Sequence, residues 1–358
     1  MPIINTILTL KDLPPPPPGT TGWPWTEQSQ PLPKQIIDAS KLPRISIITP
    51  SYNQGKFIEE TIRSVLLQGY PNVEYIIIDG GSTDRTIEVI QKYQKYIAYW
   101  ISESDQGQAD AINKGFLKAT GDLIGWQNSD DYYYPDAFIY AAQGAIHFQE
   151  YDVFYGSRNF INLDGKGSIT KDNHMSAFDL EQMIPNTNMS NQSAFFKKNI
   201  FQEGNLINKT FNHCMDHEFF WRLVFQNYKF IFIPKINACY RLHPDCKGQQ
   251  LNNDWLIDTL RICKLVYQNS DLPSTVRRQA WSFLRGACLD HYGKLRLNHF
   301  HRSLYDLVAF KGLMALDIEL VIKYLVSCLG ISNLKLIRKI ITSIKDQVLP
   351  NINSKKDY

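Results

Sequence analysis

Residues 44 to 136 alternate between short runs of apolar, β-branched residues and longer stretches in which apolar residues recur every three or four positions. Runs of the first kind indicate buried strands, and stretches of the second kind indicate amphipathic helices. We therefore expect strands at residues 45–49, 73–79, 97–102 and 123–127, with helices at 56–68, 83–96 and 109–119 between them. Strands and helices that alternate at this spacing predict a mainly parallel sheet with helices on both faces.

After residue 131 the alternation becomes less regular. We expect a helix at 136–148, strands at 153–162, 192–197, 230–233 and 238–242, and a helix at 216–226. From residue 252 onward the pattern is helical, with helices at 255–269 and 274–292 and further segments to residue 348. The chain is thus expected to hold an α/β domain at 44–250, with halves 44–136 and 137–250, and a helical region at 251–358.

Residues 1–43 have the composition of a proline-rich arm, with an unbroken proline run from Pro14 to Pro18. Proline fixes φ and removes the amide donor, so this segment is expected to be extended and polyproline-like. Trp23 and Trp25 lie within the arm. Two interpretations of these rings stay open: they fix the arm to the surface of the domain, or they bind a partner or acceptor.

Composition limits the class of binding partner and the cellular compartment that we expect. The 358 residues include 38 Lys+Arg against 35 Asp+Glu, and a net charge of +3 gives no general attraction for nucleic acid. The 6 cysteines lack paired spacing, which indicates reduced thiols in the cytosol. The start of the chain has no basic region followed by a cleavage site, and the longest apolar stretch, Gly312 to Ile331, carries charged residues. We expect a cytoplasmic protein without a membrane span.

The last predicted helix is basic and amphipathic. Its apolar face consists of Leu334, Ile337, Ile341, Ile344 and Val348, and its basic residues are Lys335, Arg338, Lys339 and Lys345. Such a helix can lie on the anionic inner face of the cell membrane as a peripheral contact. Packing against the preceding helices is the alternative.

Polar and acidic residues follow the predicted parallel strands, at 50–52, 79–82, 103–105 and 128–131. Ligands of open parallel sheets bind outside the carboxyl ends of the strands. Asp130 and Asp131 are adjacent, and two carboxylates at the end of an apolar strand are costly unless a cation compensates them. Mg²⁺ or Mn²⁺ suits such oxygen ligands. A solvated turn is the alternative, but Asp79 at the end of another strand favours the cation.

The first turn of the sheet argues against two common phosphate sites. No Gly-x-Gly-x-x-Gly follows the first strand, and the chain has no Gly-x-x-x-x-Gly-Lys-Ser/Thr. Residues 51–55 instead offer polar side chains and the ring of Tyr52. This turn suits a nucleobase better than a bare phosphate.

Five stretches together resemble the nucleotide-binding half of a family 2 glycosyltransferase with the GT-A fold. They are residues 45–55, 59–75, 78–84 (Ile-Asp-Gly-Gly-Ser-Thr-Asp), 105–115 and 128–131 (Asn-Ser-Asp-Asp). The resemblance implies inverting transfer of a sugar from a UDP-, GDP- or dTDP-sugar to the hydroxyl of a glycan or lipid-linked acceptor, with a divalent cation. It also implies a role in polysaccharide, lipopolysaccharide or glycolipid assembly. The Gln-x-x-Arg-Trp motif of the family's processive synthases is missing, which favours addition of one or a few sugars.

The resemblance also implies roles for individual residues. The base and ribose would be bordered by Pro50, Tyr52 and Asp79, and the helix beside the nucleotide would present Asp110 and Lys114. Lys114 could also neutralise the charge that develops on the leaving diphosphate.

Asn128 to Asp131 matches the family's metal motif, usually Asp-x-Asp, with Asn128 in the first position. This match implies that Asp131 contacts the metal and that Asp130 contacts ribose or sugar. His243, after the last expected strand of the domain, would be a further metal ligand or a diphosphate contact. Gln192 would face the donor sugar.

The family's general base corresponds to Asp216, at the start of a predicted helix. The residue before it, usually Glu, is Met215 here, and Glu218 is the reserve candidate for the base. Asp216 could instead only cap this helix. Because of Asn128 and Met215, a catalytically silent module that binds nucleotide-sugars is an alternative to an enzyme, and a nucleotidyltransferase is a third option.

Overall fold

In a computed structural model of the protein, residues 6–30, 42–162, 168–171, 175–244, 246–247 and 253–295 are described. The chain divides into two compact units, Met1–Trp255 and Leu256–Tyr358. The limits expected from the sequence, near residues 43, 136 and 250, stay predictions. The basic helix expected at 334–348 lies outside the described residues. Within the described residues, no helix is both long and apolar enough to cross a membrane.

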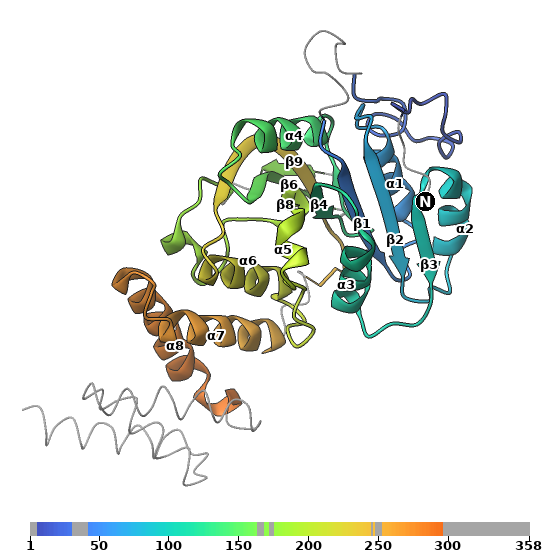
Figure 1. The fold of residues 1–358 in the computed structure, drawn as a ribbon. Coiled ribbons are helices and arrows are strands. Elements are labelled where there is room, and N and C mark those ends of the chain that lie inside the picture. The colour runs from blue at the N-terminus through green and yellow to red at the C-terminus, as the bar shows by residue number, and fades with distance from the viewer. Residues whose placement is uncertain are drawn as a thin grey trace, which may run out of the picture. The chain divides into compact units, whose positions relative to one another are not determined.

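A nine-stranded sheet forms the centre of the first unit (Figure 1). Its parallel part has the order β3 (Tyr99–Ser102), β2 (Val73–Asp79), β1 (Ile45–Ser51) and β4 (Leu123–Trp126). The strand order reverses between β1 and β4. Such a reversal opens a crevice at the carboxyl ends of the two strands, which is where ligands bind in open α/β sheets.

The second part of the sheet is mixed. It consists of β8 (Ala194–Lys197), β6 (Val153–Asn162), β9 (Phe230–Leu242) and β5 (Tyr132–Tyr133), and β7 (Ser168–Lys171) pairs with β6. Strand β8 pairs with β4 in the antiparallel direction. Because of this pairing, the sheet continues past β4. Strand β9 is continuous where the sequence predicted two strands. Pro234 lies where the register shifts between β6 and β9, a place where a strand tolerates proline.

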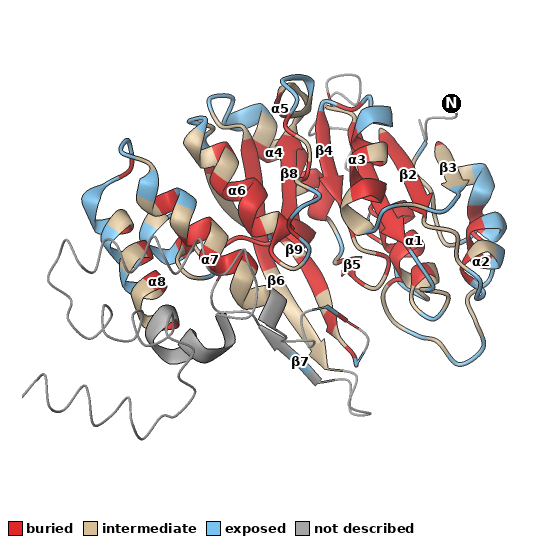
Figure 2. Ribbon diagram, turned by 90° about the horizontal axis from the view of Figure 1, so that it is seen from below, coloured by how far each residue is buried: buried red, intermediate tan, exposed pale blue. Residues whose placement is uncertain are grey.

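Helices cover both faces of the sheet. One face packs against α1 (Ile58–Leu66), α2 (Thr86–Tyr93) and α4 (Ala137–His147), which share a buried apolar core with β1 and β2. Rings of α3 (Gln108–Lys118), α5 (Lys198–Gln202) and α6 (Met215–Phe225) pack on the other face around Trp126. All residues of β1, β2 and β4 are buried, and Figure 2 shows this for β2 and β4.

The helix α3 approaches the sheet closely at Gly115. A Cβ added there would lie 2.4 Å from Cγ2 of Ile48, so only glycine allows this distance between α3 and β1. The second unit begins within α7 (Asn253–Gln268) and continues with α8 (Ser274–Leu295), which confirms a helical extension over the described part of that region. Short 3₁₀ turns occur at 94–96, 180–183 and 191–193, and the last of these replaces the start of the strand expected at 192–197.

The described residues of the proline-rich arm are bound to the α/β domain of the first unit. Trp23 donates from its indole nitrogen to the carbonyl of Tyr133 at 2.7 Å. The guanidinium of Arg63, on α1, lies 5.5 Å from the centre of the Trp25 ring. Both tryptophans thus contact the domain, as the first interpretation of the arm requires.

Candidate active site

A cavity of about 990 Å³ opens at the carboxyl ends of the parallel strands. From the N-terminal half of the domain it is lined by Pro50, Tyr52, Gly80, Asp105 and Gln108, among others. The ring of Tyr52 is 62% exposed, although most large apolar side chains of the domain are buried. An exposed aromatic ring at a cavity mouth can stack on a flat ligand.

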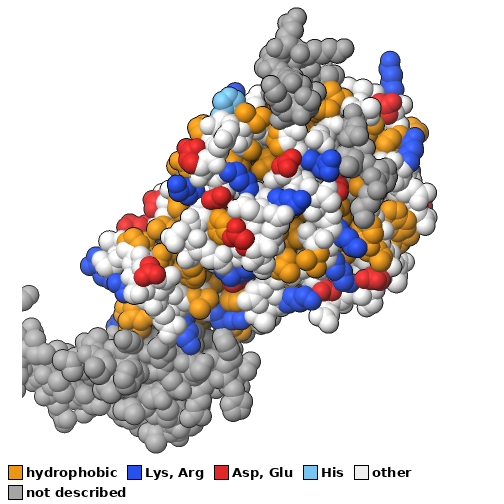
Figure 3. Space-filling model, in the orientation of Figure 1, with side chains coloured by type: hydrophobic (Ala, Val, Ile, Leu, Met, Phe, Trp, Pro, Cys, Tyr) orange, Lys and Arg blue, Asp and Glu red, His pale blue; other side chains and the backbone are white. Residues whose placement is uncertain are grey.

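The other side of the same cavity is lined by residues far along the chain. They include Asp130 after β4, Arg158 on β6, Gln192 in the 191–193 turn, Asp216 on α6 and Lys247. Acidic and basic groups therefore share one cavity. On the face shown in Figure 3, acidic and basic side chains of the described residues are also intermingled.

The neighbouring carboxylates Asp130 and Asp131 lie in different environments. Asp130 lines the cavity, whereas Asp131 is fully buried beneath it. One oxygen of Asp131 accepts from the Arg241 amide at 2.9 Å, and the other accepts from Nε2 of Gln192 at 3.0 Å and Nδ2 of Asn128 at 3.2 Å. Burial, with the charge of Asp130, raises the pKa of Asp131 to about 7. Asp131 thus joins the turn after β4 to β9 and to the 191–193 turn.

Asp130 pairs with a histidine. Its Oδ2 lies 3.1 Å from Nε2 of His243, whose ring is 4.7 Å from that of Phe57. His243 is buried behind Asp130 and is not among the residues that line the cavity. The contact of Asp131 with a cation, expected from the sequence, stays a prediction; in the structure Asp130 lines the cavity and Asp131 does not.

Asp79 is fully buried and does not line the cavity. Its carboxylate accepts from the amides of Gly81 and Ser82 at 3.0 and 2.8 Å and from the hydroxyl of Ser102 at 2.7 Å. The side chain therefore holds the turn after β2 in shape. Through this turn, Asp79 determines where the backbone of Gly80 meets the cavity.

The charged residues of α3 are engaged with each other and with nearby side chains. Lys114 lies 2.8 Å from Glu103 and 3.5 Å from Asp110, and Asp110 also pairs with Lys209. The hydrogen bond from Lys209 lowers the pKa of Asp110. Neither Asp110 nor Lys114 lines the cavity.

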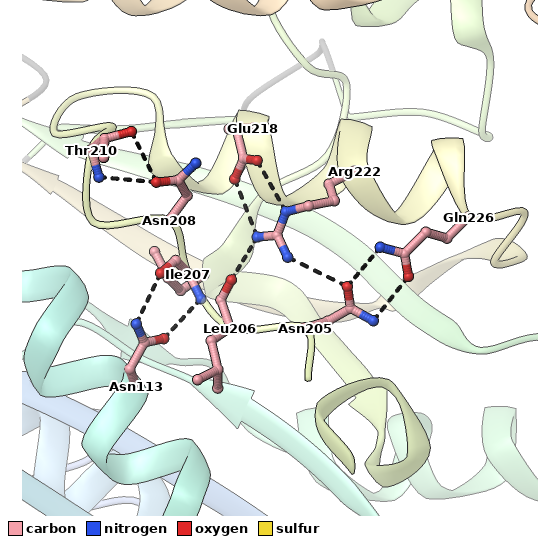
Figure 4. A network of polar contacts seen from close by, with 9 residues as sticks. All are labelled: Asn113, Asn205, Leu206, Ile207, Asn208, Thr210, Glu218, Arg222 and Gln226. Carbon is pink, nitrogen blue, oxygen red and sulfur yellow. Dashed lines mark hydrogen bonds and ion pairs between the residues drawn. The ribbon is translucent and has the colours of Figure 1, made fainter. Parts of the chain in front are cut away.

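The two candidates for the general base have different surroundings. Asp216, in the first turn of α6, lines the cavity, and the amide nitrogen of Asn191 lies 3.2 Å from its Oδ2 in the orientation that satisfies the Asn191 amide. Glu218 is buried and pairs with Arg222 at 3.0 Å. Figure 4 shows that Arg222 also donates to the carbonyl of Leu206, at 2.6 Å. Glu218 therefore belongs to a buried network and does not line the cavity.

The predicted site residues thus fall into two groups. The cavity is lined by Pro50, Tyr52, Asp130, Gln192 and Asp216. Outside the set that lines it are Asp79, Asp110, Lys114, Asp131, Glu218 and His243, which pair with other side chains or with the backbone.

Sequence reasoning missed Arg158 and Lys247, basic residues that are among the described lining of the cavity. The Arg158 guanidinium lies 4.8 Å from the centre of the Phe160 ring and 5.3 Å from that of Tyr240. The only signal in the sequence is a charged residue within a strand whose first half is apolar, and that signal does not say which cavity the residue lines.

Comparisons with known proteins show the family and the fold of the domain. Residues 46–221 match the family model described as glycosyl transferase family 2. Over these residues the chain belongs to this family. The family 2 domain is 43% identical over 94 residues to an uncharacterised glycosyltransferase of Haemophilus influenzae and 42% identical over 94 residues to TuaG of Bacillus subtilis, which is named for teichuronic acid biosynthesis. Each alignment covers 25% of this chain and only 38% and 36% of the relatives, respectively.

Solved structures show the fold. S. aureus TarS 1–349 in complex with UDP-GlcNAc matches with a TM-score of 0.55 and 16% identity, over 80% of this chain and 92% of that one. Mannosyltransferase PcManGT from Pyrobaculum calidifontis, in complex with GDP-Man and Mn²⁺, matches with a TM-score of 0.52 and 15% identity, over 80% and 88%. These matches confirm the expected α/β fold of GT-A type.

Proposed function

We propose that the family 2 domain transfers a sugar from a nucleotide-sugar to the hydroxyl of an acceptor. The observation that carries the proposal is that Tyr52, from the nucleotide-binding half, and Asp216, from the other half, line one cavity. Its volume of about 990 Å³ lies at the upper end of the range of ligand pockets, as a nucleotide-sugar requires. The fold is shared with proteins solved with UDP-GlcNAc and GDP-Man, so a UDP-, GDP- or dTDP-sugar is the proposed donor.

In this proposal Asp216 is the general base. The acceptor oxygen attacks the anomeric carbon from the side opposite the diphosphate, and its proton passes to the Asp216 carboxylate. A new carbon–oxygen bond forms as the bond to the diphosphate oxygen breaks, so the configuration inverts and a nucleoside diphosphate leaves. Asn191, next to Asp216, orients the carboxylate by its amide.

The residues present fit a divalent cation that is shared with the substrate. Within the described residues, no cluster of three or more His, Cys, Asp or Glu side chains forms a metal site. One or two carboxylates together with substrate phosphates are sufficient for Mg²⁺ or Mn²⁺, and Asp130, supported by His243, offers one carboxylate to the cavity. When bound, such a cation would offset the charge that develops on the diphosphate. We assign it to Asp130, because Asp131 already accepts three hydrogen bonds.

Arg158 and Lys247 are the proposed contacts for the diphosphate, in place of Lys114. Both line the cavity, whereas Lys114 pairs with Glu103 and Asp110 outside it. Positive groups near a leaving diphosphate stabilise the charge that the transition state develops there.

The acceptor is proposed to be a glycan or a lipid-linked glycan of polysaccharide, lipopolysaccharide or glycolipid assembly. The similarity to TuaG supports this class. A cytoplasmic location is part of the proposal, because the 6 cysteines lack the paired spacing of a secreted disulfide scaffold. Peripheral membrane contact through residues 334–348 remains a separate proposal.

The test measures donor binding and donor turnover separately. Isothermal titration of UDP-, GDP- and dTDP-sugars with Mn²⁺ identifies the donor, and release of the nucleoside diphosphate reports turnover. Asp216→Asn should bind the donor with unchanged affinity and lose turnover at least a hundredfold, because only the proton acceptor is removed. Glu218→Gln is the matched control and should retain turnover. Donor binding without any turnover in the wild type would identify a silent binding module instead.

A further inference from the structure

The buried side of α1 carries polar side chains where a core-facing helix usually has apolar ones. Thr61 and Ser64 lie on α1 and Gln68 lies just beyond its end, with exposed fractions of 0%, 0% and 2%. Their spacing of three and four positions places them on one side of the helix. Buried polar groups of this kind destabilise a domain unless they are hydrogen-bonded.

All three side chains bond the backbone of the segment after β4. Thr61 Oγ1 lies 2.9 Å from the Ser129 carbonyl and 2.6 Å from the Asp131 carbonyl. Ser64 accepts from the Tyr133 amide at 3.2 Å. Gln68 donates to the Tyr134 carbonyl at 2.9 Å and accepts from the Phe138 amide at 3.3 Å. One helix thus satisfies much of the backbone of the segment that contains Asp130.

A second element holds this segment from β9. The buried guanidinium of Arg241 donates to the Asp130 carbonyl and pairs with Glu60 on α1, and the Arg241 amide donates to Asp131 at 2.9 Å. The single hydroxyl proton of Thr61 is therefore shared between the carbonyls of residues 129 and 131, and Arg241 donates to the carbonyl of residue 130.

We propose that Thr61 and the Glu60–Arg241 pair are positioning residues, which fix the turn so that Asp130 and not Asp131 enters the cavity. The proposal rests on the proposed function, in which Asp130 serves the donor. A rotated turn would leave the Thr61 hydroxyl and the Arg241 guanidinium buried without these acceptors. Their hydrogen bonds thus select one orientation of the two adjacent carboxylates.

The decisive variant is Thr61→Val, which keeps the shape of the side chain and removes the hydroxyl. Thr61→Ser keeps the hydroxyl and is the rescue. The matched control is Thr49→Val, the same substitution at a residue that is also 0% exposed but whose hydroxyl pairs with Tyr75 at 3.1 Å. The readouts are kcat and KM for donor turnover, the melting temperature, and hydrogen exchange of the peptide over residues 127–134.

We expect Thr61→Val to lower kcat/KM at least tenfold, because small misplacement of a substrate-binding group has large effects on rate. Thr61→Ser and Thr49→Val should stay within threefold of the wild type, although Thr49→Val also loses a buried hydrogen bond. Exchange over 127–134 should rise in Thr61→Val only. Equal losses of activity in Thr61→Val and Thr49→Val would show a general effect on stability and overturn the proposal.

Hydrogen exchange separates this proposal from the proposed function. If the wild type turns over no donor, the proposed function fails, and unchanged exchange over 127–134 in Thr61→Val would still refute the positioning role. If Thr61→Val does not fold, Glu60→Gln replaces it, because this side chain is partly exposed at 22%. It should lower kcat/KM at least threefold at a similar melting temperature, and wild-type kinetics would contradict the role.

Discussion

Arg63 provides the sharpest test of how the proline-rich arm is held. Its side chain is fully buried, and its guanidinium donates to the carbonyls of Pro14, Pro24 and Trp25 at 2.8, 3.0 and 3.2 Å. A further contact, of 3.1 Å, joins it to the hydroxyl of Tyr93. Proline removes amide donors from the arm but leaves its carbonyls, so one arginine serves as the common donor for three of them.

The magnitude follows from these contacts. Each hydrogen bond from a charged donor contributes about 1.5–3 kcal/mol, and burial of the guanidinium costs several kcal/mol in return. Replacement by methionine, Arg63→Met, removes both contributions, so we expect the arm to be bound about 2–4 kcal/mol less tightly. This loss cannot exceed the free energy with which the arm binds the domain, because the carbonyls of an unbound arm are hydrogen-bonded to water.

The assay is amide hydrogen exchange of the arm. The Ser29 amide donates to the Leu67 carbonyl at 3.0 Å, so its exchange reports separation of the arm from the domain. A loss of 2–4 kcal/mol corresponds to exchange that is roughly thirty- to a thousandfold faster. The matched control is Arg85→Met, whose side chain is 75% exposed and should have no effect. Unchanged exchange at Ser29 in Arg63→Met would refute the reasoning.

Three further predictions concern the cavity and its surroundings. Glu218→Gln should lower the free energy of unfolding by about 1–3 kcal/mol through its pair with Arg222, with unchanged kcat; a lower kcat at an unchanged melting temperature would contradict this. Tyr52→Ala should raise the donor KM at least fivefold without a change in melting temperature if, as proposed, the exposed ring stacks on the base; an unchanged KM would argue against stacking. Asp131→Asn tests a pH dependence. Folding raises the pKa of Asp131 from 3.8 to about 7. Protonation of this carboxyl therefore contributes its full stabilisation of the folded state below pH 3.8, and this contribution is lost as the pH rises to 7. Measured by urea unfolding over that window, the free energy of unfolding of the wild type should fall by about 1.4 kcal/mol per pH unit relative to that of the variant. Parallel plots of this free energy against pH would show that folding does not raise the pKa of Asp131.

The sequence by itself determined the parallel half of the sheet. Strands at 45–51, 73–79 and 123–126 follow from local apolar runs, because a strand buried on both faces needs apolar residues on both faces. The sequence also singled out Tyr52 and Asp216, which line the cavity, since each lies at the end of a local element and resembles a family motif. Strands of a few residues were harder to predict from the sequence. Both β5 and β7 were missed, because so short a strand is stabilised by the neighbouring strand with which it pairs and not by its own pattern.

Only the tertiary structure decided which of two adjacent carboxylates enters the cavity. The donors to Asp131 include Gln192 and Arg241, which lie 61 and 110 residues away in the chain, and no local pattern contains them. Lys114 differs, because its acidic partners Glu103 and Asp110 lie only 11 and 4 residues away, but the sequence alone did not show that these pairs form outside the cavity. A residue type and its place at the end of a strand are properties of the sequence, whereas the direction of a side chain follows from the distant groups that satisfy its charge and hydrogen bonds.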